Sequence, residues 1–204
     1  MSLGFYKVPI AKNDPVRSYG KNSPERAALL AEVTRLKSQT IDIPMVIGGK
    51  EVTTSEKIKL TPPHEHSHIL GHASKGTAQH VQDAINAALA AKEKWAAMRW
   101  EQRLAIFMKA GDLLRTKYRN IVLAATMLAQ SKNVFQAEID AACELIDFLH
   151  FNVEFAAEIY GEQPYSPDGI WNRLEYRPLE GFVLAVTPFN FTAIAGNLPT
   201  SAAM

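Results

Sequence analysis

The feature that most constrains the fold is an apolar run near the end of the chain. Residues 181–187 read Gly-Phe-Val-Leu-Ala-Val-Thr, a run rich in Val and Phe and about as long as a buried strand. Pro188 ends the run, and small residues of helical character follow at 192–197. The pattern predicts a strand, a loop and a helix start in an α/β fold. Ligands bind beyond the carboxyl ends of strands in open α/β sheets, so we expect the chemistry at the loop 187–191.

Asn190 is the polar side chain of most interest in this loop. An amide held by a turn can donate hydrogen bonds to an oxygen that becomes negative during a reaction, although it cannot act as an acid or a base. The alternative is an ordinary loop asparagine that satisfies nearby backbone groups. The spacing of residues alone leaves both roles open.

A helix expected from about Val134 to Tyr160 carries the second candidate, Glu144. One side of this helix is an apolar stripe, and three aromatic residues lie well round from it, at 148, 151 and 155. Four acidic residues form a stripe that we expect to be solvated: Asp140, Asp147, Glu154 and Glu158. Glu144 falls at the edge of this stripe, against the aromatic residues, so it belongs either to the solvated face or to a site.

The composition is that of a globular protein and excludes several classes of partner. Of the 204 residues, 47% are hydrophobic, which is enough for a core. The chain has 22 Lys and Arg and 21 Asp and Glu, so its net charge is too small to favour binding to nucleic acid. No apolar run approaches the roughly 20 residues of a membrane-spanning helix, so we expect no membrane association. The single cysteine, Cys143, excludes an internal disulfide and suits a reducing compartment. We interpret it as a packed core thiol.

The histidines at 64, 66 and 68 alternate as ligands on a strand would. No second cluster of soft ligands lies nearby in the sequence, and the run follows Thr-Pro-Pro at 61–63. A solvated loop explains the run, so we expect no metal site.

The loop sequence resembles a known family. Thr-Pro-Phe-Asn-Phe at 187–191, after Glu-Tyr-Arg-Pro-Leu-Glu-Gly-Phe-Val at 175–183, resembles the aldehyde dehydrogenase superfamily. The version Phe-Asn-Phe-Thr-Ala-Ile-Ala-Gly-Asn-Leu at 189–198 resembles one branch, the 1-pyrroline-5-carboxylate dehydrogenases. Gly-Lys-Asn-Ser-Pro-Glu-Arg at 20–26 and the segment 136–147 match the same branch, so the resemblance spans nearly the whole chain.

The resemblance implies a reaction and roles for particular residues. This branch oxidises L-glutamate 5-semialdehyde to L-glutamate with NAD, in proline degradation. By resemblance, Asn190 supplies the oxyanion-hole amide, Thr187, Pro188 and Phe189 lie at the cofactor, and Glu144 and Phe191 contact the substrate. The family's cysteine nucleophile, its general base and its ribose-binding lysine belong to later segments.

The resemblance also implies a domain organisation. We expect an arm at 1–22, the helical part of the cofactor domain at 23–160 with short antiparallel strands at 46–73, and a connector with an oligomerisation-arm strand at 161–180. The first strand of a doubly wound, Rossmann-like NAD-binding sheet and the oxyanion loop are expected at 181–204.

These expectations describe the N-terminal part of a longer enzyme that is inactive as 204 residues alone. The family implies a homodimer or higher homo-oligomer, in the cytoplasm or, after removal of a transit peptide, in the mitochondrial matrix. The alternatives are a non-catalytic helical interaction module derived from a dehydrogenase, and an aldehyde dehydrogenase of different substrate.

Overall fold

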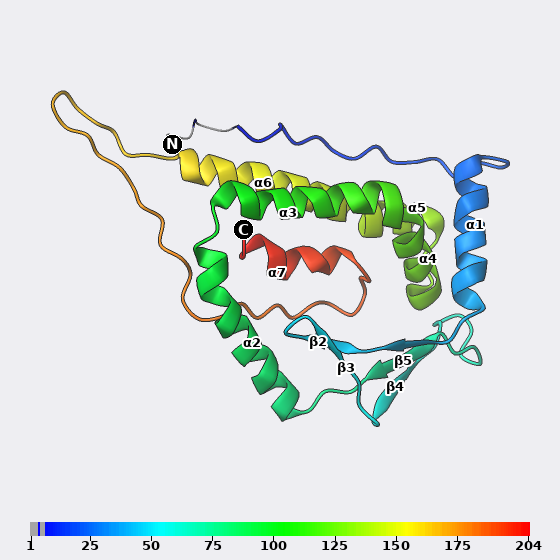
Figure 1. Cartoon of the computed structure of the whole chain (residues 1–204). Coiled ribbons are helices and arrows are strands. Elements are labelled where there is room, and N and C mark those ends of the chain that lie inside the picture. The colour runs from blue at the N-terminus through cyan, green and yellow to red at the C-terminus, as the bar shows by residue number, and fades with distance from the viewer. Residues whose placement is uncertain (1–3, 5–6) are drawn as a thin grey trace.

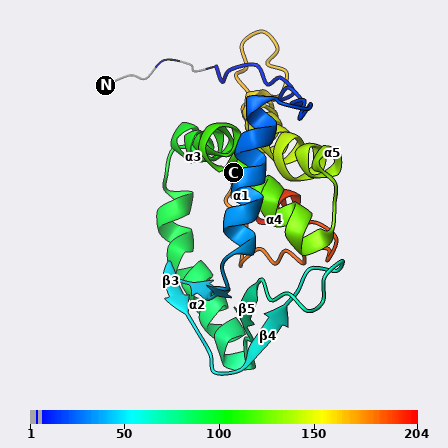
Figure 2. The same ribbon diagram turned by 90° about the vertical axis from the view of Figure 1, so that its right-hand side faces the viewer.

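The computed structural model describes residues 4 and 7–204. Its elements are, in chain order, α1 (Pro24–Lys37), β1 (Ile41–Ile43), β2 (Met45–Ile47), β3 (Lys50–Val52), β4 (Lys57–Leu60), β5 (Gly71–Ser74), α2 (Ala78–Ala96), α3 (Trp100–Leu113), α4 (Arg119–Gln130), α5 (Val134–Ala137), α6 (Glu144–Gly161) and α7 (Asn197–Ser201). Helices with small sheets are the fold class expected for this part of the chain. Figure 1 shows most of the helices above the strands, with α2 running down beside them, and Figure 2 shows the strands at one end of the molecule.

The helical layer is built on two pairings, α3 with α6 and α1 with α4. Between α3 and α6 the buried side chains are Leu104, Phe107, Leu145, Leu149 and Val153. A second core centres on Leu123 of α4, which is fully buried against Leu29 of α1. The apolar stripe expected on the helix from Val134 to Tyr160 is therefore confirmed, because Ile146, Leu149 and Val153 are buried.

The helix starts follow the expected capping chemistry. The Ser23 side chain accepts a hydrogen bond from the Arg26 backbone N–H, with Pro24 at the first helical position of α1. Thr77 caps α2 in a capping box with His80. The long helix expected from Val134 to Tyr160 is confirmed as α5, a π-helical segment at Glu138–Cys143, and α6.

The strands form two small sheets. β2 and β3 make an antiparallel hairpin whose turn uses Gly48 and Gly49 at φ of 58° and 76°, the region that glycine enters without a Cβ clash. The other sheet has the order β1-β5-β4. The expectation of a purely antiparallel unit is wrong, because β5 pairs in parallel with β1 and antiparallel with β4.

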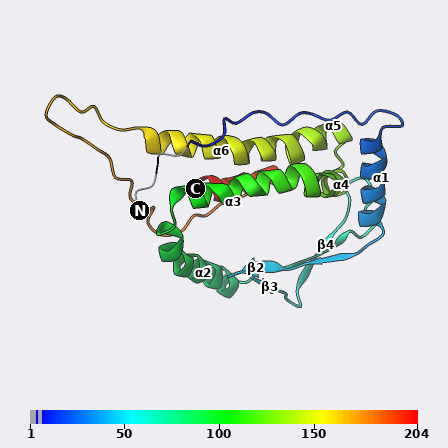
Figure 3. The same cartoon turned by 45° about the horizontal axis from the view of Figure 1, so that its top comes forward.

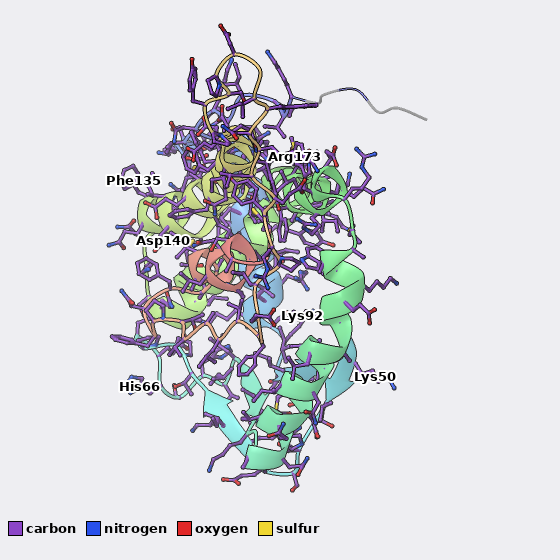
Figure 4. The ribbon with its side chains drawn as sticks, turned by 90° about the vertical axis from the view of Figure 1, so that its left-hand side faces the viewer. Lys50, His66, Lys92, Phe135, Asp140 and Arg173 are labelled. Atoms are coloured by element: carbon purple, nitrogen blue, oxygen red, sulfur yellow. The ribbon has the colours of Figure 1, made fainter. Side chains whose placement is uncertain are left out.

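A long irregular segment, which we call the strap (residues 162–193), leads from α6 to α7. Figure 1 shows it looping away from the body, returning past α2 and running between the helices and the strands. Lys92 of α2, labelled in Figure 4, pairs with Glu180 at 2.8 Å and ties the strap to the body. The strands expected at 170–177 and 181–187 are not formed, since the sheets of the described residues contain β1–β5 alone and offer this backbone no neighbour.

Residues 7–22 of the N-terminal arm run along α6, as Figures 1 and 3 both show. Asp147 accepts hydrogen bonds from the Asp14 N–H at 2.6 Å and the Asn13 Nδ2 at 2.8 Å, and Glu154 accepts one from the Ala11 N–H at 2.9 Å. The prediction of a solvated acidic stripe is therefore wrong for Asp147 and Glu154, because these carboxylates satisfy the backbone of the arm. Glu158 is exposed as expected.

Candidate active site

The candidate loop, residues 187–191, passes the carboxyl end of α4. Gln130, the last residue of α4, donates from Nε2 to the Phe189 carbonyl at 3.2 Å. Two residues later, the Lys132 Nζ donates to the Asn190 carbonyl at 2.7 Å. The loop is thus held to the helical layer through its backbone oxygens. Its side chains at Thr187, Pro188 and Phe189 are left exposed, Phe189 to 97%.

The side-chain amide of Asn190 is exposed and makes no hydrogen bond to any residue in the described parts of the chain. The alternative role weighed for this residue, satisfying nearby backbone groups, requires such a bond. The structure instead fixes the Asn190 backbone and leaves both amide N–H groups available to donate. An unbonded amide can donate to a ligand oxygen, so the oxyanion-hole role of Asn190 stays a prediction.

Lys132 is the residue of this site that sequence reasoning missed. Its ammonium lies 4.3 Å from the centre of the Phe191 ring and pairs with the Asp140 carboxylate, and the two charged side chains are only 19% and 13% exposed. Ser131 ends α4 in the left-handed region at φ 56°, which turns the chain so that Lys132 follows directly. No periodic pattern marks Lys132, because its partner Asn190 is 58 residues away.

The assignment of Asp140 to a solvated stripe is likewise wrong. Asp140 lies in the π-helical segment Glu138–Cys143, where each turn is wider than an α-helical turn. Projection at ~100° per residue therefore misplaces the side chains of this segment. Figure 4 labels Asp140 on the same helical layer that carries the loop.

A pair of threonines fixes the next residue of the strap. The buried Thr126 hydroxyl donates to the Val122 carbonyl at 2.7 Å, so its oxygen is left to accept from the hydroxyl of Thr192. Four consecutive residues of the chain, 189–192, are thus held by α4 and the turn after it. The contacts are made by Thr126, Gln130 and Lys132.

Glu144 is the first residue of α6 and is half-buried. It makes no hydrogen bond or ion pair within residues 4 and 7–204. Both α6 and the segment Glu138–Cys143 contact the short turn Ile194–Gly196 that follows the loop. Phe151 and Phe155 form an aromatic pair further along α6, with ring centres 6.0 Å apart. The structure places Glu144 on an element that touches the loop region, without a bond to Asn190 or Phe191.

Cys143 lies apart from the loop, in a buried ion network formed by Asp14, Arg115, Arg119 and Glu138 with Tyr19. The Arg119 Nη2 donates to the Cys143 Sγ at 3.2 Å. Burial, together with the Glu138 carboxylate, raises the pKa of the Cys143 thiol to about 11. A thiol that is protonated at neutral pH is not a nucleophile, in agreement with its interpretation as a core residue.

The histidine run makes one contact with this region. The His64 Nδ1 lies 2.7 Å from the Ser131 Oγ, beside the turn that carries Lys132. Among the described residues no three His, Cys, Asp or Glu side chains converge as a metal site would require. Within the same residues, no helix has the length and apolar character to cross a membrane.

A helical layer with small sheets is the fold class that the aldehyde dehydrogenase resemblance implied for this part of the chain. A family model described as the aldehyde dehydrogenase family matches residues 51–204. The chain belongs to the aldehyde dehydrogenase family.

The relatives point to one branch of this family. The Delta-1-pyrroline-5-carboxylate dehydrogenase of Agaricus bisporus is 50% identical over 204 residues, covering 99% of this chain and 37% of the fungal protein. The mitochondrial enzyme of the same name from Bos taurus is 46% identical, covering 94% of this chain and 34% of its own length. The crystal structure of the Mycobacterium tuberculosis Delta-pyrroline-5-carboxylate dehydrogenase bound with NAD matches with a TM-score of 0.95 at 50% identity, covering 98% of this chain and 38% of that one. The chain spans little more than a third of these relatives.

Proposed function

We propose that this chain is part of an NAD-dependent dehydrogenase that oxidises L-glutamate 5-semialdehyde, derived from 1-pyrroline-5-carboxylate, to L-glutamate. The observation that carries the proposal is the loop at 187–191, whose backbone is fixed by Gln130 and Lys132 while the Asn190 amide stays unbonded. Identities of 46% and 50% to pyrroline-5-carboxylate dehydrogenases support the substrate. Oxidation of glutamate semialdehyde by the full-length enzyme, with NAD reduction followed by absorbance, tests it against other aldehydes.

The exposed part of the loop fits a dinucleotide cofactor. Pro188 and Phe189 offer flat apolar surface, and the Thr187 hydroxyl makes no hydrogen bond within the described residues. When bound, NAD supplies the hydride acceptor. The role proposed for this chain is to hold the aldehyde oxygen at the Asn190 amide and to contact the substrate through Glu144 and Phe191.

Replacing Glu144 by alanine is expected to lower kcat/KM for glutamate semialdehyde by roughly tenfold or more, the scale of a lost charge-assisted contact. The reason is that Glu144 is half-buried on a helix that contacts the turn after the loop and has no protein partner among the described residues, which leaves its carboxylate free for substrate. The control is Glu158→Ala, on the exposed face of the same helix. Glu154 is unsuitable because it binds the arm. Equal kcat/KM for both variants at matched thermal stability would show that Glu144 does not contact the substrate.

Cys143 is expected to take no part in the chemistry. The full-length Cys143→Ala enzyme should keep kcat within about threefold of wild type, because a buried thiol with a raised pKa cannot supply a thiolate. For the same reason the 204 residues alone, in which Cys143 is the single cysteine, should not reduce NAD with glutamate semialdehyde. Turnover by these 204 residues that disappears in Cys143→Ala would contradict this.

We also propose a homo-oligomer, in which the outer part of the strap contacts a second copy. Tyr165 and Trp171 are 84% and 87% exposed there, and large exposed aromatic residues favour an interface. We propose a cytoplasmic location, with the mitochondrial matrix as the alternative. The bovine relative carries "mitochondrial" in its name and the fungal one does not.

A further inference from the structure

The ammonium of Lys132 has three contacts. Two are with the candidate loop, and the third is with Asp140, which neutralises the lysine charge. It donates to the Asn190 carbonyl at 2.7 Å, lies 4.3 Å from the centre of the Phe191 ring and pairs with Asp140. Two of its three N–H donors are used by the Asn190 carbonyl and Asp140, and the contact with the ring is a cation–π interaction.

The backbone on both sides of Lys132 is fixed. Before it, Ser131 adopts the left-handed conformation that ends α4. After it, Asn133 caps α5: its Oδ1 accepts from the Gln136 N–H at 2.9 Å, while its own N–H donates to the Gln136 Oε1 at 3.0 Å. The backbone that carries the Lys132 side chain is therefore held by a turn on each side.

The contacts of Lys132 fall on the parts of the loop that orient Asn190. Lys132 bonds the carbonyl of Asn190 and contacts the ring of the next residue, Phe191. These two contacts restrain the peptide group that joins Asn190 to Phe191. The Asn190 amide, which is not restrained, projects from this fixed backbone. Lys132 and Asp140 are largely shielded from water, which screens partly buried charges less. The attraction between the two side chains is therefore stronger than on an exposed surface.

We propose that Lys132 is a positioning residue that fixes the backbone from which the Asn190 amide donates to the developing oxyanion, and that Asp140 holds the lysine charge in place. This inference rests on the proposed function, in which Asn190 is the oxyanion donor. In this role Lys132 acts through Asn190. Misplacing a preorganised donor weakens its bond to the transition state, so the loss falls on kcat more than on KM.

The test is a double-mutant cycle in the full-length enzyme. Lys132→Met keeps the apolar stem and removes the charge, and it should lower kcat about 10- to 50-fold with KM changed less than about threefold. Lys132→Arg, which restores a cation, should recover most of this loss. In the Asn190→Ala background, Lys132→Met should change kcat less than about threefold, because the group it positions is gone. An equal fold-loss in both backgrounds would overturn the proposal.

A second readout does not depend on the substrate. Amide hydrogen exchange in peptides covering 187–193 should be faster in Lys132→Met than in wild type and return toward wild type in Lys132→Arg. The matched control is Lys117→Met, since Lys117 also lies over an aromatic ring, that of Tyr118 at 5.0 Å, outside the loop. Unchanged exchange at 187–193 in Lys132→Met would overturn the inference. An inactive wild-type enzyme with this exchange pattern intact would overturn the proposed substrate alone.

Discussion

Replacing Asn190 by alanine in the full-length enzyme is expected to lower kcat by about 10² to 10³, the scale of losing one oxyanion-hole donor. The Asn190 backbone stays fixed by Lys132 in this variant, because the bond is made by the carbonyl and not by the side chain. The fold of the loop should therefore survive, and the loss should fall on the chemical step. Steady-state turnover of glutamate semialdehyde measures it.

The control for this prediction is Asn86→Ala. Asn86 lies in α2 and accepts a hydrogen bond from Gln82 on an exposed surface, so its loss should leave kcat unchanged within about twofold. If Asn190→Ala also kept kcat within about threefold, Asn190 would be a structural loop residue. The assignment of the loop to the active site would then fail.

The second large effect is expected on stability, from the buried ion network. Replacing Glu138 by alanine should lower the free energy of unfolding by about 3–5 kcal/mol, the scale of leaving a buried charge without its partner. Glu138 and Arg119 are both buried and bonded to each other, and Arg119 also bonds Asp14 at 2.5 Å. Without Glu138, the guanidinium would stay buried with only part of its neutralising charge.

The network also anchors the N-terminal arm. The Glu138 carboxylate accepts from the Arg17 backbone N–H and from the Tyr19 hydroxyl, each at 2.8 Å. In denaturant titrations Glu138→Ala should therefore unfold earlier, and its arm should become a protease target before the helices do. The control is Glu158→Ala, an exposed carboxylate expected to change stability by less than about 0.5 kcal/mol. A loss below 1 kcal/mol for Glu138→Ala would contradict the prediction.

The same network gives stability a defined pH dependence. Burial alone raises the pKa of Asp14 and Glu138, but hydrogen bonds and charge from Arg119 outweigh it, so both carboxyl pKa values lie below their ordinary range. Their stabilisation is present above the unfolded pKa of about 4 and is lost as the pH falls through the lowered native values. Burial and Glu138 raise the pKa of Tyr19 to about 12, so its contribution is lost as the pH rises from about 10 to 12. In Glu138→Ala the free energy of unfolding should therefore change less with pH, both in the acid range and between about pH 10 and 12.

What the sequence could predict was local. The start of α1, the Thr77 cap and the Gly48–Gly49 turn depend on neighbouring residues alone. The apolar stripe of α6 follows from helical periodicity in the same way. These features required no knowledge of which segments meet.

What could not be predicted was non-local. Lys132 meets Asn190 across 58 residues, and Arg119 meets Asp14 across 105. Asp147 and Glu154 look solvated in sequence because their partners are backbone groups of an arm more than 130 residues away. The run 181–187 has the composition of a buried strand, but a strand needs a neighbouring strand to pair with. Composition describes the side chains and carries no information on that neighbour.

The most direct test of the central claim, that the Asn190 amide serves the chemical step, is a single-turnover measurement. NADH formation by full-length Asn190→Ala, with enzyme in excess over glutamate semialdehyde and NAD saturating, should be about 10² to 10³ slower than wild type, while the Kd for NAD changes less than about threefold. A single-turnover rate equal to that of wild type, or a loss explained by weaker NAD binding alone, would contradict it.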